Sequence, residues 1–476
     1  MTDLIKTQCY INGAWTGTPE MVVTNPATGE EIVKVPYMGG AEAEQAIEAA
    51  HEAFGLWSAM LAKERSAILR KWYELIMENA DELGEILTRE QGKPFAEAKG
   101  EITYAASFVE FYAEEAKRIY GETIPTPFKD GRIVVVRQPV GVVAAITPWN
   151  FPAAMITRKL APAFAAGCTA VVKPAEDTPL TAFALAELAH RAGLPKGVLN
   201  VLTGEAKDIG MAMCSSKKVR ALTFTGSTPV GKILMKQCAD TVKKLGLELG
   251  GNAPFIVFDD ADVDAAVQGA IASKFRNAGQ TCVCANRLYV QDAIYDEFAK
   301  KLAAEVAKMT VGNGMEEGMV QGPLINDSAV DKVEGLLKDA TDRGAKVIEG
   351  GARHEKGGRF FEPTVLTGMT SDMKMTTDEI FGPVAPLYRF KDEAEVVALA
   401  NATDFGLASY FYARDIGRVW RVAEALEYGM VCINSGALST EVAPFGGVKE
   451  SGIGREGSHH GVEEFIEMKY MMMGGI

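Results

Sequence analysis

The segment Phe224-Thr225-Gly226-Ser227-Thr228-Pro229-Val230-Gly231 indicates the fold class of this chain of 476 residues. It continues the apolar run 221–224, turns at a glycine and goes on with a helix pattern. This order predicts a strand, a tight turn and a helix. Because the backbone amides of a helix N-terminus attract anions, a pyrophosphate can bind there. We therefore expect Gly226, Ser227 and Gly231 to belong to a nucleotide site.

Short apolar strands alternate with helix patterns on both sides of this segment. Up to residue 247 the strands are expected at 142–146, 170–172, 198–202 and 221–224. Such alternation is typical of a parallel, doubly wound sheet. A second alternation runs from a strand at 254–258 to about residue 433, with helices expected at 263–273 and 292–309. The sequence therefore predicts an α/β protein of two or three domains, since this length exceeds what one core fills.

The remaining segments predict a helical N-terminal region and a β-hairpin. Residues 41–117 read as amphipathic helices, and Asp130-Gly131 is a turn signal before the β-rich run 132–136. The end of the chain, at 466–472, has high β-propensity and little net charge, so it would aggregate as an exposed edge. We expect the Asp130 hairpin of another subunit to cover it.

The composition excludes several classes of protein. A net charge of −14 and a pI near 5.1 disfavour a nucleic-acid partner, because phosphate backbones bind basic surfaces. No apolar run reaches the ~20 residues of a membrane span, and the start of the chain lacks the pattern of a secretory signal. Seven scattered cysteines fit reduced thiols, without a zinc-type pair of CxxC motifs. We therefore expect a cytoplasmic protein with no nucleic acid, membrane or metal as partner.

Three further motifs point to thiol chemistry. One cysteine ends the polar segment Phe275-Arg276-Asn277-Ala278-Gly279-Gln280-Thr281-Cys282, which suits a nucleophile, although a lone cysteine is more often a buried small side chain. Pro148-Trp149-Asn150-Phe151-Pro152 and Glu248-Leu249-Gly250-Gly251 precede it in that order. With these motifs the chain resembles the NAD(P)-dependent aldehyde dehydrogenase family over nearly its whole length, most closely the succinate-semialdehyde dehydrogenases.

The resemblance implies a catalytic set of three residues. Cys282 is expected to be the nucleophile, and Asn150 to form an oxyanion hole with the backbone N–H of Cys282. Glu248 is expected to activate the water that releases the product. The five histidines lie outside every motif, which leaves the role of general base to a carboxylate. Alone, Asn150 would be a turn residue and Glu248 a capping or solvated group.

The resemblance also implies a dinucleotide cofactor. The residues that it assigns to cofactor contacts, besides the turn at 226–231, are Trp149, Lys173, Glu176, Glu379 and Phe381. A carboxylate at Glu176 accepts from the ribose 2′- and 3′-hydroxyls and repels a 2′-phosphate, so we expect NAD rather than NADP. The literal G-x-G-x-x-G at 452–457 follows a polar run and not a strand, and we reject it as the nucleotide site.

The substrate site is expected to recognise an anionic aldehyde. Arg158, Arg276 and Ser439 resemble the positions by which succinate-semialdehyde dehydrogenases hold the distal carboxylate, although an isolated arginine usually lies at the surface. Two guanidinium groups would clamp a carboxylate and would also favour the thiolate of Cys282. Cys284 resembles the partner in a reversible disulfide with Cys282, and is otherwise a buried small residue.

These motifs predict an enzyme that oxidises succinate semialdehyde to succinate with NAD, through a thiohemiacetal and a thioester. The runner-up substrate is glutarate semialdehyde, because a pocket discriminates one methylene by only ~1–3 kcal/mol. A second alternative is a non-catalytic NAD-binding or structural relative, which the intact set of Cys282, Glu248 and Asn150 disfavours.

The expected domains follow the motifs along the chain. We assign residues 1–117 and 139–247 to a Rossmann-like NAD-binding domain, and residues 248–433 to an α/β catalytic domain. Residues 118–138 and 455–476 would form a small β arm for oligomerisation, which implies a homodimer or a homotetramer.

Overall fold

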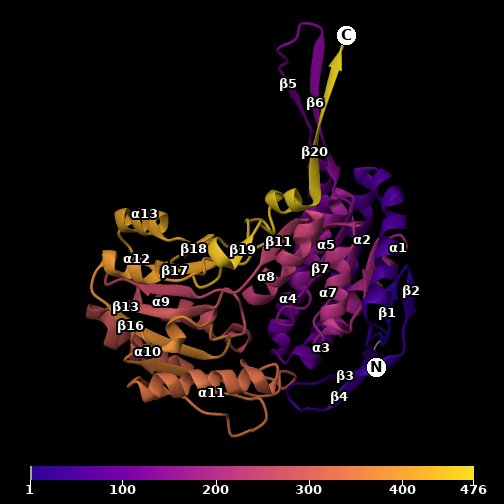
Figure 1. Ribbon diagram of the computed structural model, residues 1–476. Coiled ribbons are helices and arrows are strands. Elements are labelled where there is room, and N and C mark those ends of the chain that lie inside the picture. The colour runs from indigo at the N-terminus through magenta and orange to yellow at the C-terminus, as the bar shows by residue number, and fades with distance from the viewer. Residues whose placement is uncertain (1–2) are drawn as a thin grey trace.

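The computed structural model describes residues 3–476 and contains two large β-sheets surrounded by helices (Figure 1). The strands of the eight-stranded sheet, in order across it, are β19 (Gly452–Ile453), β11 (Lys244–Glu248), β10 (Val219–Thr225), β7 (Val142–Ile146), β8 (Thr169–Lys173), β9 (Leu199–Val201), β1 (Cys9–Ile11) and β2 (Ala14–Thr16). Those of the seven-stranded sheet are β14 (Lys346–Glu349), β15 (Thr364–Thr367), β16 (Val384–Phe390), β13 (Ala285–Gln291), β12 (Ala253–Val257), β17 (Ala408–Tyr412) and β18 (Met430–Ile433). Parallel pairs form the centre of both sheets, which confirms the predicted α/β class.

Helices cover both faces of the eight-stranded sheet. On one face α5 (Ala154–Ala166) packs on β7 and β8, with α4 (Phe95–Glu115) and α2 (Ala62–Glu78) behind it. On the other face lie α1 (Gly40–Ala59), α7 (Ala206–Ser215) and α8 (Thr228–Cys238). The remaining α-helices are α3 (Ala80–Gln91), α6 (Pro179–Arg191), α9 (Val263–Lys274), α10 (Tyr295–Val306), α11 (Asp327–Asp342), α12 (Glu393–Asn401) and α13 (Ile416–Ala425). This arrangement is the predicted doubly wound one.

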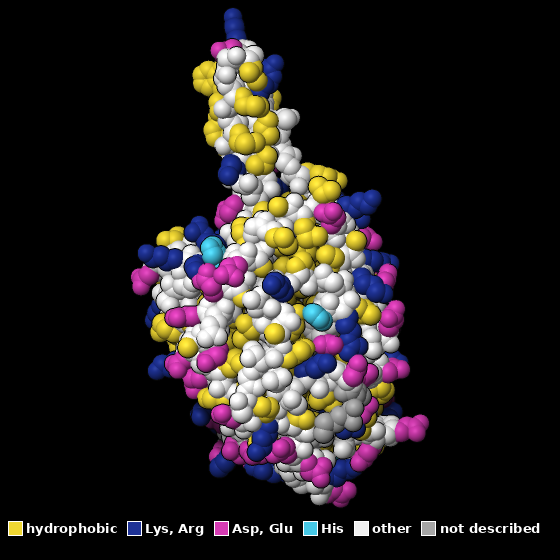
Figure 2. Space-filling view, turned by 90° about the vertical axis from the view of Figure 1, so that its right-hand side faces the viewer, with side chains coloured by type: hydrophobic (Ala, Val, Ile, Leu, Met, Phe, Trp, Pro, Cys, Tyr) yellow, Lys and Arg dark blue, Asp and Glu magenta, His cyan; other side chains and the backbone are white. Residues whose placement is uncertain are grey.

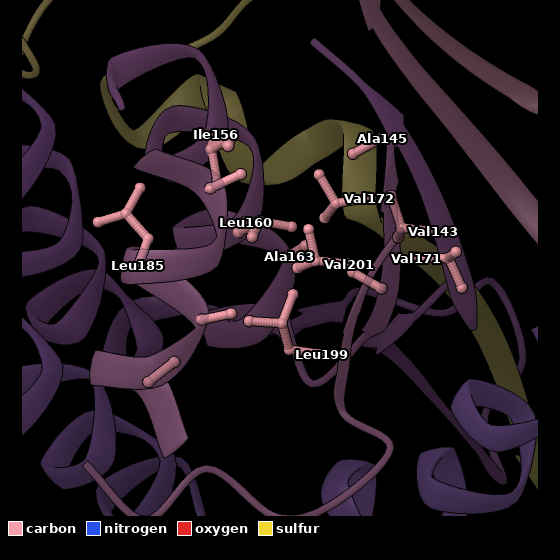
Figure 3. Packing of buried hydrophobic residues seen from close by; sticks show 14 of the residues in the cluster. Val143, Ala145, Ile156, Leu160, Ala163, Val171, Val172, Leu185, Leu199 and Val201 are labelled. Atoms are coloured by element: carbon pink, nitrogen blue, oxygen red, sulfur yellow. The ribbon is translucent and has the colours of Figure 1, made fainter. Parts of the chain in front are cut away.

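The packing of α5 on the sheet explains why this segment is so apolar. Every residue of α5 is buried, and Figure 3 shows its Ile156, Leu160 and Ala163 beside the strands. These three positions share one face of the helix because they are four and three residues apart. Successive residues of β8, Val171 and Val172, point to opposite faces of the sheet, and both are buried because helices cover both sides.

The predicted elements agree with the structure to within a few residues. The strand at 142–146 is found as β7 with those bounds, and the helix at 263–273 as α9. The helix predicted at 292–309 is shorter, because a 3₁₀ turn at Asp292–Ile294 precedes α10 and the helix ends at Val306. No helix among residues 3–476 is both long and apolar enough to cross a membrane.

A three-stranded arm projects from the body of the protein (Figure 1). It consists of the hairpin β5 (Glu122–Ile124) and β6 (Gly131–Pro139) with the C-terminal strand β20 (Ile466–Gly474). β20 pairs antiparallel along all of β6, from Ile466 opposite Pro139 to Gly474 opposite Gly131. The expectation that a hairpin of another subunit covers this strand is therefore wrong: its partner is the hairpin of its own chain. A two-stranded sheet of β3 (Pro19–Thr24) and β4 (Glu31–Pro36) completes the fold.

Candidate active site

A cavity of about 270 Å³ lies at the carboxyl ends of the central strands of the eight-stranded sheet. The segments after β7, β10 and β11 form part of its wall, and the segment before β13 brings Cys282 to it. The predicted site residues that line this cavity are Trp149, Asn150, Gly226, Ser227, Cys282, Glu379 and Phe381. Residues far apart in the sequence therefore meet where open α/β sheets bind their ligands.

Cys282 follows a strained turn. In the 3₁₀ turn Arg276–Gly279, the φ angles of Asn277, Ala278 and Gly279 are +51°, +54° and +73°. Left-handed backbone is costly for residues with a Cβ, and such strain concentrates at functional sites. A Cβ on Gly279 would lie 2.1 Å from the carbonyl oxygen of Gly382, so only glycine fits there. The turn leaves Cys282 partly exposed in the cavity.

The Gly250-Gly251 pair lies against the nucleophile segment. A Cβ on Gly251 would lie 2.3 Å from the backbone carbonyl oxygen of Cys282. Because glycine has no side chain, the backbone at Gly251 can pack closely against the backbone of Cys282. The N–H of Gly251 also donates to Oε1 of Glu379 across 3.1 Å, so three separate motifs are held together at this point.

Asn150 lies in the loop after β7, and its side chain contacts the segment before Cys282. Its Nδ2 donates to the carbonyl oxygen of Gln280 across 3.0 Å, while its Oδ1 has no hydrogen-bond partner in the described chain. An amide group carries two hydrogens, so one of them remains available to a ligand. This geometry fits a donor of an oxyanion hole beside Cys282.

Two buried charged residues that the sequence did not single out hold the Asn150 loop. Nζ of Lys93 lies 2.6 Å from Oε2 of Glu101 and 2.7 Å from the backbone oxygen of Asn150. Glu101 also accepts from the backbone N–H of Ala153 across 2.9 Å. In the sequence Lys93 belongs to a polar break between helices, and nothing local shows that its side chain is buried.

Glu248 is the last residue of β11 and is buried, with no hydrogen-bond partner for its Oε2 among residues 3–476. Burial, together with the carboxylate of Glu456, raises the pKa of Glu248 well above its usual range. A carboxyl group with a raised pKa is a stronger base once it has lost its proton. The position of Glu248 thus suits a general base.

Glu456 is a second acid of the site, and it lies within the motif 452–457 that we rejected as a nucleotide site. The start of this motif forms β19, antiparallel to β11, and no strand-turn-helix unit is present there. Glu456 accepts from Nε of Arg158 and from Nζ of Lys159. Burial opposes its ionisation, but the two cations outweigh burial and keep the pKa of Glu456 below its usual range. The two cations thus favour ionisation of Glu456, while burial disfavours ionisation of Glu248.

The surroundings of Cys282 do not ionise its thiol. Burial raises the pKa of Cys282 to about 12, although the Arg158 cation acts in the opposite direction. The charge of Arg158 thus acts in the expected direction, toward the thiolate, but desolvation outweighs it. A base is needed to take the thiol proton.

The residues expected to bind the cofactor lie partly beyond the cavity. The rings of Trp149 and Phe381 pack edge to face with centroids 5.6 Å apart. Lys173, the last residue of β8, forms an ion pair with Glu176, and neither is among the described residues that line the cavity. A Cβ on Gly231 would come within 2.5 Å of Leu249, so packing of α8 explains the need for glycine there.

The N-terminus of α8 is suited to an anion. Gly226 and Ser227 line the cavity immediately before this helix. Ser227 makes no side-chain cap, and the first turn of α8 contains no acidic residue. The first amides of the helix are therefore free of negative side chains, as binding of a pyrophosphate requires. These residues fit a dinucleotide.

Arg158 has an unused donor. It lies in α5, is 1% exposed, and its guanidinium carbon lies 4.0 Å from the ring centroid of Phe445. Its Nε donates to Glu456, but its Nη2 has no hydrogen-bond partner in the described part of the chain. A buried N–H without a partner is costly, so this geometry fits the binding of an anionic ligand.

Arg276 and Ser439 lie close to Arg158. Arg276 stacks on Phe151, with its guanidinium carbon 4.7 Å from the ring centroid. The phenol of Tyr104 lies within electrostatic reach of both arginines and beside the side chain of Ser439. The structure therefore brings the three residues expected to bind the substrate together around one tyrosine.

Cys284 is buried and free, and its Sγ lies 3.2 Å from the carbonyl oxygen of Lys274. Burial raises the pKa of Cys284, while the ammonium group of Lys274 acts to lower it. Its pairing with Cys282 in a disulfide stays a prediction.

Comparisons with known proteins agree with this geometry. The model of the aldehyde dehydrogenase family matches residues 15–471. The chain is 61% identical to a glutarate-semialdehyde dehydrogenase of Pseudomonas aeruginosa and 60% identical to a succinate-semialdehyde dehydrogenase [NADP(+)] of Escherichia coli, each over 99% of both chains. It is 60% identical to a 3-sulfolactaldehyde dehydrogenase of Pseudomonas putida, over 99% of this chain and 98% of that protein. A crystal structure of succinate-semialdehyde dehydrogenase from Burkholderia pseudomallei superposes with a TM-score of 0.98 at 61% identity, covering 99% of this chain and 98% of the other.

Proposed function

The chain belongs to the aldehyde dehydrogenase family, and we propose that it oxidises succinate semialdehyde to succinate with NAD as its preferred cofactor. The observation that carries the choice of substrate is the buried, unpaired Nη2 of Arg158, whose charge acts on Cys282. Arg276 adds a second cation near the same place. Two guanidinium groups offer charge-assisted hydrogen bonds to a carboxylate at the far end of a short aldehyde.

In the proposed reaction Sγ of Cys282 attacks the aldehyde carbon and its proton leaves to a base or to water. Nδ2 of Asn150 and the backbone N–H of Cys282 stabilise the oxyanion. The bound cofactor supplies the hydride acceptor, and loss of the hydride from the thiohemiacetal leaves a thioester on Cys282. Glu248 then takes a proton from a water molecule, which attacks the thioester carbon and breaks the C–S bond. One aldehyde, one water and one NAD thus yield one carboxylate, one NADH and two protons.

The relatives support a substrate with a distal acid group. They are named for succinate semialdehyde, glutarate semialdehyde and 3-sulfolactaldehyde, and each of these aldehydes carries a carboxylate or a sulfonate. Glutarate semialdehyde is the second candidate substrate, because it differs from the first by one methylene, which a pocket discriminates by only ~1–3 kcal/mol.

The preference for NAD rests on Glu176. Its carboxylate would accept from two ribose hydroxyls and repel a 2′-phosphate, and its ion pair with Lys173 withholds that cation from a phosphate. One relative is named for NADP(+), and the ratio of kcat/KM for NAD and NADP tests the preference directly.

The substrate proposal is tested by comparing kcat/KM for succinate semialdehyde, glutarate semialdehyde and butanal. We expect both acids to be preferred over butanal, and Arg276→Met to remove most of that preference while retaining activity on butanal, because the loss of a charge-assisted pair costs ~2–5 kcal/mol. A wild-type enzyme without a preference for the acids would refute the carboxylate clamp. No NADH formation from any aldehyde would favour a non-catalytic relative.

We also propose a division of labour along the chain, in which residues 1–117 and 139–247 bind the cofactor and residues 248–433 supply the nucleophile. The arm is proposed to join subunits. Hydrophobic side chains gather along the arm (Figure 2), among them the exposed Met468, Tyr470 and Met473 of β20. Light scattering should show a smaller particle for Met473→Lys and an unchanged one for the control Met211→Lys, an exposed position on α7. Equal particle mass in both variants and the wild type would refute this role.

A further inference from the structure

One face of α4 contacts two segments of the site, the turn before Cys282 and the Asn150 loop. Glu97, Glu101, Tyr104 and Phe108 share this face, because they are separated by four, three and four residues. Glu97 accepts from the backbone N–H of Asn277 across 3.0 Å, in the turn before Cys282. Glu101 accepts from the N–H of Ala153 in the Asn150 loop. Tyr104 is the next side chain along this face.

The hydroxyl group of Tyr104 is buried and unpaired. The ring is partly exposed and packs against Phe108 with centroids 5.0 Å apart. The hydroxyl oxygen makes no hydrogen bond of normal geometry among the described residues, although the side chain of Ser439 is near enough to act on it. Tyr112, on the same helix, shows the usual arrangement, since its hydroxyl donates to the carbonyl oxygen of Ser458 across 2.9 Å. Buried polar groups without a partner are costly and call for a ligand.

The surroundings of Tyr104 are rich in donors and poor in acceptors. Arg158 and Arg276 act on its phenol, Ser439 lies beside it, and Nη2 of Arg158 is also unpaired in the described chain. The acid that acts on this phenol, Glu456, already accepts from Arg158 and Lys159. Burial raises the pKa of Tyr104, so the phenol keeps its proton and remains a donor. Two unpaired donors within electrostatic reach of each other fit the oxygens of one anion.

We propose that Tyr104 is a further specificity residue, whose hydroxyl donates a hydrogen bond to the distal acid group of the substrate together with Arg158 and Arg276. This inference rests on the proposed function, because it takes the ligand to be an aldehyde with a carboxylate at its far end. Attraction between opposite charges alone would not fix the orientation of that carboxylate. A neutral donor on a ring that packs against Phe108 adds one more fixed direction to the hydrogen bonds that the two guanidinium groups offer.

Tyr104→Phe tests the inference, since it removes the hydroxyl and keeps the ring against Phe108. We expect kcat/KM for succinate semialdehyde to fall about 10- to 100-fold, mainly through a higher KM, because hydrogen bonds to charged groups are worth that much. Activity on butanal should change less than about twofold, and succinate should inhibit about tenfold more weakly. Tyr112→Phe is the matched control, because it removes a paired hydroxyl from the same helix and should not alter the ratio of the two substrates.

The outcomes separate two kinds of failure. Equal activity of Tyr104→Phe and the wild type on succinate semialdehyde would overturn the inference, and so would an equal loss on both aldehydes, which marks a structural role. If the wild type itself did not prefer succinate semialdehyde to butanal, the proposed function would fail before Tyr104 came into question.

Discussion

Nζ of Lys93 lies 2.7 Å from the backbone carbonyl oxygen of Asn150. The same ammonium group pairs with Glu101 at 2.6 Å, and both side chains are almost fully buried. One buried ion pair therefore fixes the backbone of the loop that carries the proposed oxyanion donor. Its loss is expected to affect both stability and catalysis.

Lys93→Met should lower the free energy of unfolding by about 3–5 kcal/mol, because it leaves the carboxylate of Glu101 buried without a cation. Urea unfolding measures this loss, and kcat should fall as the Asn150 loop loosens. Lys99→Met is the control, since Lys99 forms an exposed ion pair with Asp81, and such pairs contribute about 0–1 kcal/mol. Similar small effects of the two variants would contradict the role given to Lys93.

Glu248→Gln should produce a burst of NADH followed by a stall. The thioester can still form, but the amide cannot take a proton from the water that must release the product. Stopped-flow absorbance records the burst, and mass spectrometry detects the acylated Cys282. Cys282→Ala should show neither burst nor turnover while it still binds the cofactor. Slow steady turnover of Glu248→Gln without a burst would instead place Glu248 in the first half of the reaction.

Glu176→Ser should raise the activity with NADP relative to NAD. The substitution removes a repulsive carboxylate and frees the ammonium group of Lys173 to meet a 2′-phosphate. The ratio of kcat/KM for the two cofactors is the measurement. An unchanged ratio would mean that Glu176 does not touch the ribose.

Turnover should increase as the pH rises from the usual range of a glutamate carboxyl group through the raised pKa of Glu248. Burial and Glu456 raise the pKa of Glu248, so the fraction of deprotonated base grows as the pH rises through that value. The other charged groups that act on Glu248 are Arg158, Lys159 and Arg455. Cys282, with a pKa of about 12, contributes to the same increase, because the fraction of its thiolate form also grows as the pH rises. A flat or falling profile of kcat/KM would contradict both assignments.

The main elements of the fold could be predicted because each left a local pattern. The apolar run at 142–146 became β7, and the glycine turn after β10 opens α8. Asn150, Glu248 and Cys282 could be named because their three motifs, in this order, resemble those of the aldehyde dehydrogenase family. The common cavity of Asn150 and Cys282 agrees with that assignment.

The contacts of Lys93, Tyr104 and Glu456 could not be predicted, because a contact between distant positions leaves no periodicity. Glu456 stood in a motif that suggested phosphate binding, and Lys93 in what read as a loop. The pKa of Cys282 depended on a balance of burial against charge that only distances can decide. The partner of β20 was predicted wrongly, because an apolar strand sequence indicates that its edge must be covered but does not indicate which chain covers it.

The glycine at position 251 limits which substitutions protein engineering can use. A methyl group there would lie 2.3 Å from the carbonyl oxygen of Cys282, so even alanine would displace the nucleophile by about 1 Å, and misplacement on that scale costs about 100-fold in rate. Libraries that aim to widen the aldehyde range should therefore leave this position invariant. Sequence diversity is better placed at Arg276 and Ser439, the residues proposed to contact the far end of the substrate.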